Sequence, residues 1–292
     1  MFKKLFKYDF KSTKRIGFPL LIGVGGLTVI GVIAMLVFAS SFKALIYMPE
    51  NADDTLMITT TLSMISAVTF LFGALIGLAV IAIAMEVYCF VDFYKSTVTD
   101  EAYLTFTLPV KVKDLIFSKT LCAFLWFTIQ SVAITISVGI ILGTGVIALG
   151  EEYSVLLEDL QSMGFDPNIL INNYVGDIVL NYVLNFVYNI VNTLNTILLV
   201  FTAIFFVSTV MRKHRVLGAI GGIVIANAII GGITGIVQTI VGLIAGVIGE
   251  LAQNPYISGN ITTFVMTIIV GGITIALFFG LKYLMEKKLN IE

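Results

Sequence analysis

Six long apolar runs constrain the fold of this chain more than any other feature of its sequence. Each is longer than the roughly 20 residues that an α-helix needs to cross a bilayer. Several are so much longer that their helices must tilt or continue beyond the membrane. The sequence therefore predicts an all-α integral membrane protein with six transmembrane helices. The runs lie near residues 17–40, 57–91, 116–149, 178–210, 216–249 and 260–284.

The composition favours the same class. Hydrophobic residues make up 58% and charged residues 12% of the 292 residues, and the mean hydropathy is +1.03. A soluble domain this apolar would not cover its own surface. Cys89 and Cys122 lie in or beside apolar runs, so they indicate neither a disulfide framework nor a metal site. Residues 1–292 are predicted to form one transmembrane domain, whose first run lacks the cleavage site of a signal peptide.

The lysines and arginines predict the orientation. Sixteen of the 17 lie before the first run, in or at the edge of the segments between the second and third runs and between the fourth and fifth, or at the end of the sixth run and after it. Only Lys43 lies in a segment of the other side, where acidic residues gather instead. By the positive-inside rule, both termini are expected in the cytoplasm.

The residues before the first apolar run have a pattern of their own. At helical spacing Phe2, Leu5, Phe6 and Phe10 share one face, and lysines fill the remainder. This pattern is typical of a helix that lies in the interface of an anionic leaflet. We therefore expect a separate interfacial helix over residues 1–16.

The segment 92–115 is the longest polar, charge-mixed stretch between two apolar runs. Thr99 can cap a short helix there, with Asp100 and Glu101 in its first turn, where carboxylates suit the helix dipole. Pro109 excludes helical geometry at the residue before it, so this helix ends after about two turns. We expect this cytoplasmic connector to bind another protein. Its candidate contact residues are Thr99, Asp100, Glu101, Tyr103, Leu104, Phe106 and Pro109.

The large apolar side chains of this connector have no membrane to enter. Tyr103, Leu104 and Phe106 either fill a groove on a partner, as buried anchors of interfaces do, or pack back on the helix ends of their own chain.

The fourth apolar run carries a stripe of amides. At about 100° per residue the five asparagines and Tyr188 fall within an arc of roughly 120°. Amides in hydrocarbon need hydrogen-bond partners, so this face should not meet lipid. Either it joins helices together, or it lines a substrate path. The residues are Asn181, Asn185, Tyr188, Asn189, Asn192 and Asn195.

Two further patterns leave alternatives open. The spacings Gly231-x-x-x-Gly235 and Gly242-x-x-x-Gly246 let helices approach closely, between two copies of the chain or within one. The outside loop over residues 150–177 has apolar residues at helical spacing from Tyr153 to Met163, which suit a lid or a plain connector.

Several kinds of chemistry are missing from the sequence. The glycine run Gly231–Gly235 lacks the lysine of a phosphate-binding loop. The single histidine, His214, lies in a basic loop, so no histidine-dependent hydrolase or metal site can be assembled. Glu86 is the one candidate for an ionisable group within a span. We expect Glu86 near the cytoplasmic interface, where a lysine could pair with it, and a functional role for Glu86 stays open.

The connector resembles a known family. It reads Asp100-Glu-Ala-Tyr-Leu-Thr-Phe-Thr-Leu-Pro-Val110, followed by Ser118-Lys119. This is similar to the cytoplasmic segment of type-2 ABC transporter permeases of Gram-positive bacteria. The two chain ends, residues 1–11 and 284–290, resemble the same group. The family has glycine where Ala102 stands, and alanine favours helix at that position.

The resemblance implies a six-span subunit of the bacterial plasma membrane that pairs with a second permease chain. We expect a homodimer rather than a heterodimer, and the sequence leaves both open. Two separate cytoplasmic ATPase subunits would bind ATP and Mg, so this chain would hold no cofactor and no active site of its own, and no nucleic acid. The connector would be the coupling helix, and the N-terminal helix would also approach the ATPase. Export would follow alternating access. Within the family, the chain most resembles the exporters of amphipathic peptide toxins or of antimicrobial peptides.

The residues themselves are also compatible with two other classes of protein. A secondary transporter or channel would act without an ATPase. A membrane scaffold or sensor subunit would transport nothing.

Overall fold

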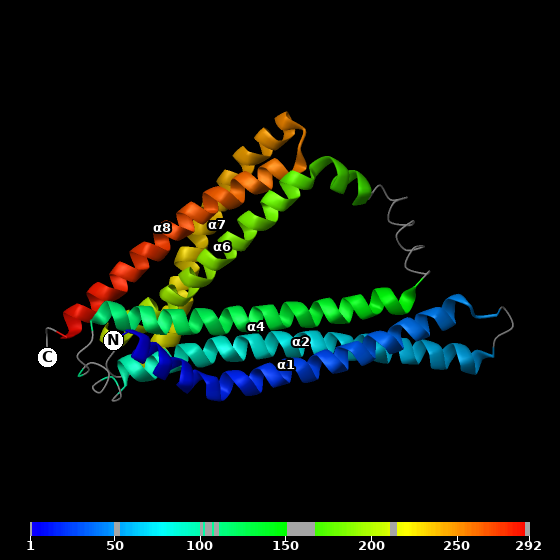
Figure 1. Cartoon of the computed structure of the whole chain (residues 1–292), viewed down its shortest axis with the longest axis horizontal. Coiled ribbons are helices and arrows are strands. Elements are labelled where there is room, and N and C mark those ends of the chain that lie inside the picture. The colour runs from blue at the N-terminus through cyan, green and yellow to red at the C-terminus, as the bar shows by residue number, and fades with distance from the viewer. Residues whose placement is uncertain are drawn as a thin grey trace. The chain divides into compact units, whose positions relative to one another are not determined.

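The computed structural model describes residues 2–49, 53–99, 102, 107, 111–150, 167–210 and 215–289. In these ranges it has six long helices, each with a stretch apolar enough to cross a membrane. Even α8, at 35 residues and about 1.5 Å per residue, exceeds a hydrocarbon core of about 30 Å. The chain is a multi-pass membrane protein. Its helices are α1 (Phe2–Ile46), α2 (Asp54–Val98), α4 (Val112–Leu149), α6 (Pro167–Val210), α7 (Arg215–Ala252) and α8 (Pro255–Leu289) (Figure 1).

Local backbone chemistry explains two of the helix ends. Helix α4 stops at Gly150, which has φ 61° and donates its N–H to the carbonyl of Val146 at 3.2 Å. Helix α7 stops before Gln253, which has φ 54°. There the N–H groups of Gln253 and Asn254 bond to the carbonyls of Glu250 and Gly249. Both arrangements satisfy carbonyls that a helix end would otherwise leave without donors.

The expected separate N-terminal helix is wrong. Residues 2–16 belong to α1, which continues without a break to Ile46. Pro19 lies inside α1, where it removes one backbone hydrogen bond and bends a helix without ending it. The predicted phenylalanine face also contacts the protein itself, because the ring of Phe2 lies 5.3 Å from that of Phe117 on α4.

The start of the fourth helix also differs from the prediction. Helix α6 begins at Pro167, well before residue 178, so part of the expected outside loop is helical. Proline suits a first helical position because its missing N–H has no intrahelical partner there. The apolar positions of the proposed loop helix, Tyr153 to Met163, lie outside the described residues.

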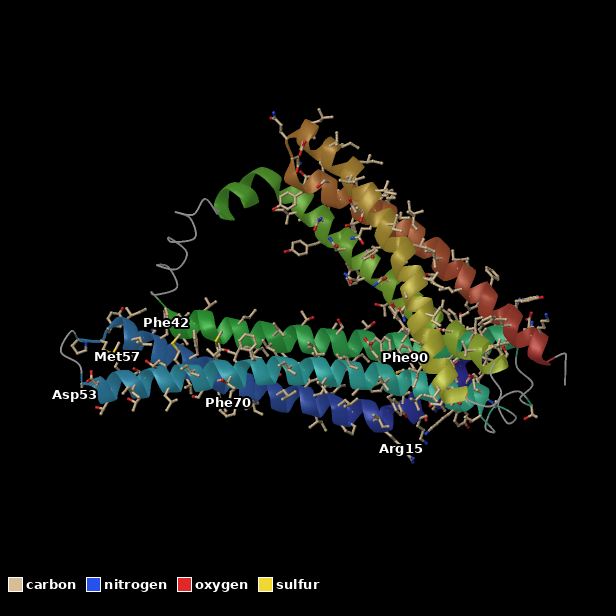
Figure 2. The ribbon with its side chains drawn as sticks, turned by 180° about the vertical axis from the view of Figure 1, so that it is seen from behind. Arg15, Phe42, Asp53, Met57, Phe70 and Phe90 are labelled. Atoms are coloured by element: carbon tan, nitrogen blue, oxygen red, sulfur yellow. The ribbon has the colours of Figure 1, made fainter. Side chains whose placement is uncertain are left out.

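The chain divides into two compact units. The first, here called the three-helix unit, comprises residues 11–88 and 125–166. Within it α1, α2 and α4 lie along one another (Figure 1), and small residues let them approach. Gly31 faces Ile141, Gly77 faces Leu27 and Gly145 faces Met35, and each glycine leaves no room for a Cβ atom. Arg15 and Asp53 lie at opposite ends of this unit (Figure 2).

The second, here called the junction unit, comprises residues 1–10, 89–124 and 167–292. Helices α6, α7 and α8 contact one another pairwise in it. Half of the most apolar stretch of α6 is buried, against 11–17% in the other five helices. The buried part of α6 runs from Ile197 to Phe205, so α6 is the central helix of this unit.

Candidate functional site

Four side chains from three helices form a buried charged cluster in the junction unit. The ammonium of Lys119 on α4 lies 3.0 Å from Asp9 Oδ1 on α1 and 3.2 Å from Asp92 Oδ2 on α2. The hydroxyl of Ser118 donates to Asp9 Oδ2 at 2.6 Å. We call Asp9, Asp92, Ser118 and Lys119 the charged junction.

The charged junction is shielded from its surroundings. Lys119 is 8% exposed, and Asp9 and Asp92 are 15% and 26% exposed. Removing charges from water costs several kcal/mol per ion unless each finds a partner. The Lys119 ammonium pairs with both carboxylates, and the Ser118 hydroxyl also bonds to Asp9. Every member of the charged junction therefore has a partner. The junction thus fixes the start of α1, the end of α2 and the start of α4 in one arrangement.

The two flanks of the connector are packed against the rest of the junction unit. On the α2 side Phe93 stacks on Phe201 of α6, with centroids 3.7 Å apart and planes at 5°, and both are 1% exposed. Thr97 and Val98, the last residues of α2, are buried. On the α4 side Ile116 is fully buried. Both flanks of the connector are therefore buried, and the Phe93–Phe201 stack joins the α2 flank to α6.

The structure describes little of the connector itself. Thr99 donates its hydroxyl to the carbonyl of Lys95 at 2.6 Å, so this hydroxyl serves the last turn of α2. Its backbone carbonyl accepts the N–H of Ala102 at 2.8 Å, and Ala102 is buried. The remaining predicted contact residues, Asp100, Glu101, Tyr103, Leu104, Phe106 and Pro109, lie outside the described residues.

The amide stripe of α6 separates into two parts. Asn181 donates to Oδ1 of Asn260 on α8 at 2.9 Å, and Asn195 accepts the hydroxyl of Thr274 on α8 at 3.5 Å. Asn185 donates to Asn181 on its own helix. The middle of the stripe is different.

Asn189 and Asn192 are exposed, and Tyr188 is half-buried. Asn189 donates to the carbonyl of Asn185 at 2.8 Å. The ends of the stripe thus join α6 to α8, as the helix-joining alternative predicts. Its middle leaves two amides on the surface of an apolar helix.

The charged junction was not predicted from the sequence. Asp92 is there only the first residue of the polar segment 92–115, and Ser118-Lys119 is only part of the motif that carries the family resemblance. One signal was present: Asp9 is the single acidic residue among the lysines of the first 16 residues. An isolated carboxylate in a basic helix is a candidate for a buried partner elsewhere.

No ion pair joins Glu86 to a lysine in the part of the chain that the structure describes. The ion pairs found there involve Lys119 and Lys282. Lys95 lies nine residues after Glu86, about 180° around the same helix, and points away from it.

Comparison with protein-family models, curated proteins and solved structures finds no match to this chain.

Proposed function

We propose that this chain is the membrane subunit of an ATP-driven exporter whose ATPase is a separate protein. The observation that carries the proposal is the charged junction. A segment that a cytoplasmic partner can reach is joined at both flanks to one buried cluster, which also holds the start of α1. Force applied to such a connector reaches three helices together. A permease that is driven by a separate ATPase requires such a joint movement of its helices.

A second copy of the chain completes the proposed transporter. A Cβ atom built at Gly231, Gly235, Gly242 or Gly246 of α7 meets nothing within 4 Å. Close packing within the described part of the chain therefore does not account for these glycines. Small residues on one helix face are typical of contacts between membrane helices, and pairing of two α7 helices in a homodimer uses them.

The exposed middle of the amide stripe supports an amphipathic substrate. Asn189 and Asn192 offer donors and acceptors. Phe186, one turn before Asn189, and Val183, one turn before Phe186, are exposed apolar groups of the same helix. A peptide with one polar and one apolar face finds both kinds of partner on this part of α6. A peptide toxin or antimicrobial peptide fits that description.

The proposal is tested by purifying the tagged chain from its own host in mild detergent. An ATPase subunit at stoichiometric yield, and ATP hydrolysis that rises with an amphipathic peptide, are the expected results. A chain that transports without any ATPase is a secondary transporter or channel. A chain that recruits an ATPase but never stimulates it is a scaffold.

A double variant assigns the contact. Tyr103→Ala with Leu104→Ala should lower ATPase recovery or uncouple hydrolysis from transport, because buried apolar anchors dominate interface energies. The same dipeptide recurs at Tyr283-Leu284 near the end of α8, where Tyr283 is exposed. Its double alanine variant is the matched control and should behave as wild type. Equal behaviour of the two double variants contradicts the proposed role of the connector.

A further inference from the structure

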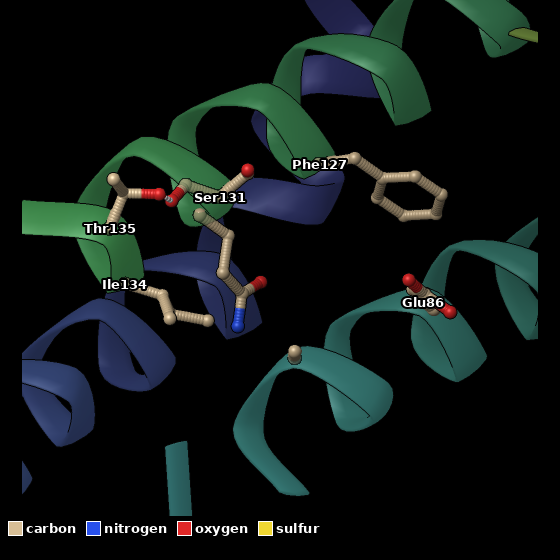
Figure 3. A pocket seen from close by; sticks show the side chains of 7 residues that line it. Glu86, Phe127, Ser131, Ile134 and Thr135 are labelled. Atoms are coloured by element: carbon tan, nitrogen blue, oxygen red, sulfur yellow. Dashed lines mark hydrogen bonds between the residues drawn. The ribbon is translucent and has the colours of Figure 1, made fainter. Parts of the chain in front are cut away.

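The three-helix unit has a pocket between α2 and α4 that the proposed function does not use. Its volume is about 280 Å³, near the lower end of the roughly 300–1,000 Å³ of small-ligand pockets. Figure 3 shows Glu86 of α2 across the pocket from Ser131 of α4, with the ring of Phe127 beside it. The lining residues are Ala82, Glu86, Phe127, Gln130, Ser131, Ile134 and Thr135.

The polar groups of this pocket include three acceptors without partners. Gln130 is 5% exposed, and its Nε2 donates to the carbonyl of Ile81 at 2.9 Å. That bond fixes the amide and leaves its oxygen free. In the part of the chain that the structure describes, the Gln130 oxygen, the Glu86 carboxylate and the Ser131 hydroxyl have no hydrogen-bond or ion-pair partner.

The described residues supply no cation to this carboxylate. No lysine, arginine or histidine is among the residues that line the pocket. On α2 itself, the positions one turn before and after Glu86 hold Ala82, Ile83, Cys89 and Phe90. An unpaired carboxylate within an apolar helix is costly, so a cation brought by another molecule would stabilise its charged form.

We propose that this pocket binds an ammonium group carried on an apolar stem. The Glu86 carboxylate neutralises the charge, and the free oxygens of Gln130 and Ser131 accept N–H bonds, which are strong when the donor is charged. The face of the Phe127 ring attracts the cation. Ala82 and Ile134 provide the apolar wall that the stem contacts. A bare metal cation would use the oxygens but neither the ring nor this wall.

The test uses the purified chain alone, without ATPase or nucleotide, so its result does not depend on the proposed function. The protein is placed in nanodiscs of phosphatidylglycerol, which carries no amine, and titrated with hexylammonium chloride. Trp126 is the only tryptophan and precedes Phe127, so its fluorescence reports binding. We expect a saturable change with hexylammonium and none with 1-hexanol, the neutral control.

Variants assign the site. Glu86→Gln keeps the shape of the side chain and should weaken binding at least about tenfold, because it removes the charge that attracts the ammonium. Phe127→Leu should weaken it about 2- to 30-fold, the range of cation–π contributions. Glu286→Gln makes the same chemical change at an exposed position of α8 and should leave binding unchanged.

Three results overturn the proposal: equal affinity of wild type and Glu86→Gln, an equal response to hexanol, or an equal Glu86-dependent response to sodium. Two competitors then identify the source of the ammonium. One is phosphatidylethanolamine added to the discs, and the other is a lysine-bearing amphipathic peptide compared with its norleucine counterpart. Displacement by either supports the proposal and names the source, whereas displacement by neither contradicts it.

Discussion

The indole ring of Trp126 on α4 lies against Gly17 of α1 so closely that a side chain at residue 17 would overlap it. The indole N–H donates to the hydroxyl of Thr13 at 3.1 Å, one turn before Gly17. Trp126 is 2% exposed. The contact thus joins α1 to α4 through one hydrogen bond and one position that only glycine fits.

The first prediction concerns this contact. Gly17→Ala should destabilise the protein by about 1–3 kcal/mol through overpacking, offset by up to about 1 kcal/mol from the better helix propensity of alanine. The control is Gly25→Ala on the same helix, where a Cβ atom meets nothing within 4 Å. Thermal unfolding followed by Trp126 fluorescence should show the first variant clearly less stable than the second. Equal midpoints would contradict the packing.

The second prediction concerns the charged junction. Lys119→Met leaves two partly buried carboxylates without their cation and should cost about 3–5 kcal/mol, as the breaking of buried ion pairs does. Lys282→Met removes the cation of an exposed pair with Glu286 at 3.7 Å and should cost about 0.3–0.5 kcal/mol. Denaturant titration in detergent micelles measures both. A Lys119→Met variant as stable as Lys282→Met would mean that the junction adds no stability.

The third prediction separates the two parts of the amide stripe. Asn260→Leu removes the acceptor of Asn181 and should lower stability by about 0.6 kcal/mol, with an upper value near 1.7. Asn192→Leu, at an exposed position, should leave stability unchanged and reduce peptide-stimulated transport. Thermal unfolding and a transport assay read the two effects separately. A loss of stability in Asn192→Leu would place this amide in a packing role.

The fourth prediction concerns orientation. In a background without Cys89 and Cys122, a cysteine at Ser96 should stay unlabelled by an impermeant reagent in intact cells. A cysteine at the exposed Ala252 should be labelled, because the positive-inside rule places the α7–α8 turn outside. Labelling of both positions after permeabilisation is the control. The reverse pattern in intact cells would invert the topology.

The sequence predicted the existence and order of the six helices because each apolar run is long. The predicted first and last residues of the helices were less accurate. An apolar run ends at the first charged residues, whereas a helix ends where its backbone hydrogen bonds end. Helix α2 therefore continues through Asp92 and Lys95 to Val98, and α1 begins before its first apolar run. A helix that extends into water keeps its hydrogen bonds, so hydropathy does not report its end.

The charged junction shows why clusters are harder to predict than helices. Asp9 and Lys119 lie 110 positions apart, and no local spacing relates them. Their proximity follows from how α1 and α4 pack, which is a tertiary property. The amide stripe was predictable as a face because its residues share one helix, yet the division between its ends and its middle depends on where α8 passes.

The turn between α7 and α8 has a consequence for how the protein is made. Gln253 and Asn254 are the only residues between the two helices, and Asn254 also accepts the N–H of Tyr256 and donates to Asp177. A connection this short does not let one helix cross the bilayer while the other waits. We therefore expect the two helices to leave the translocon together, as a single hairpin.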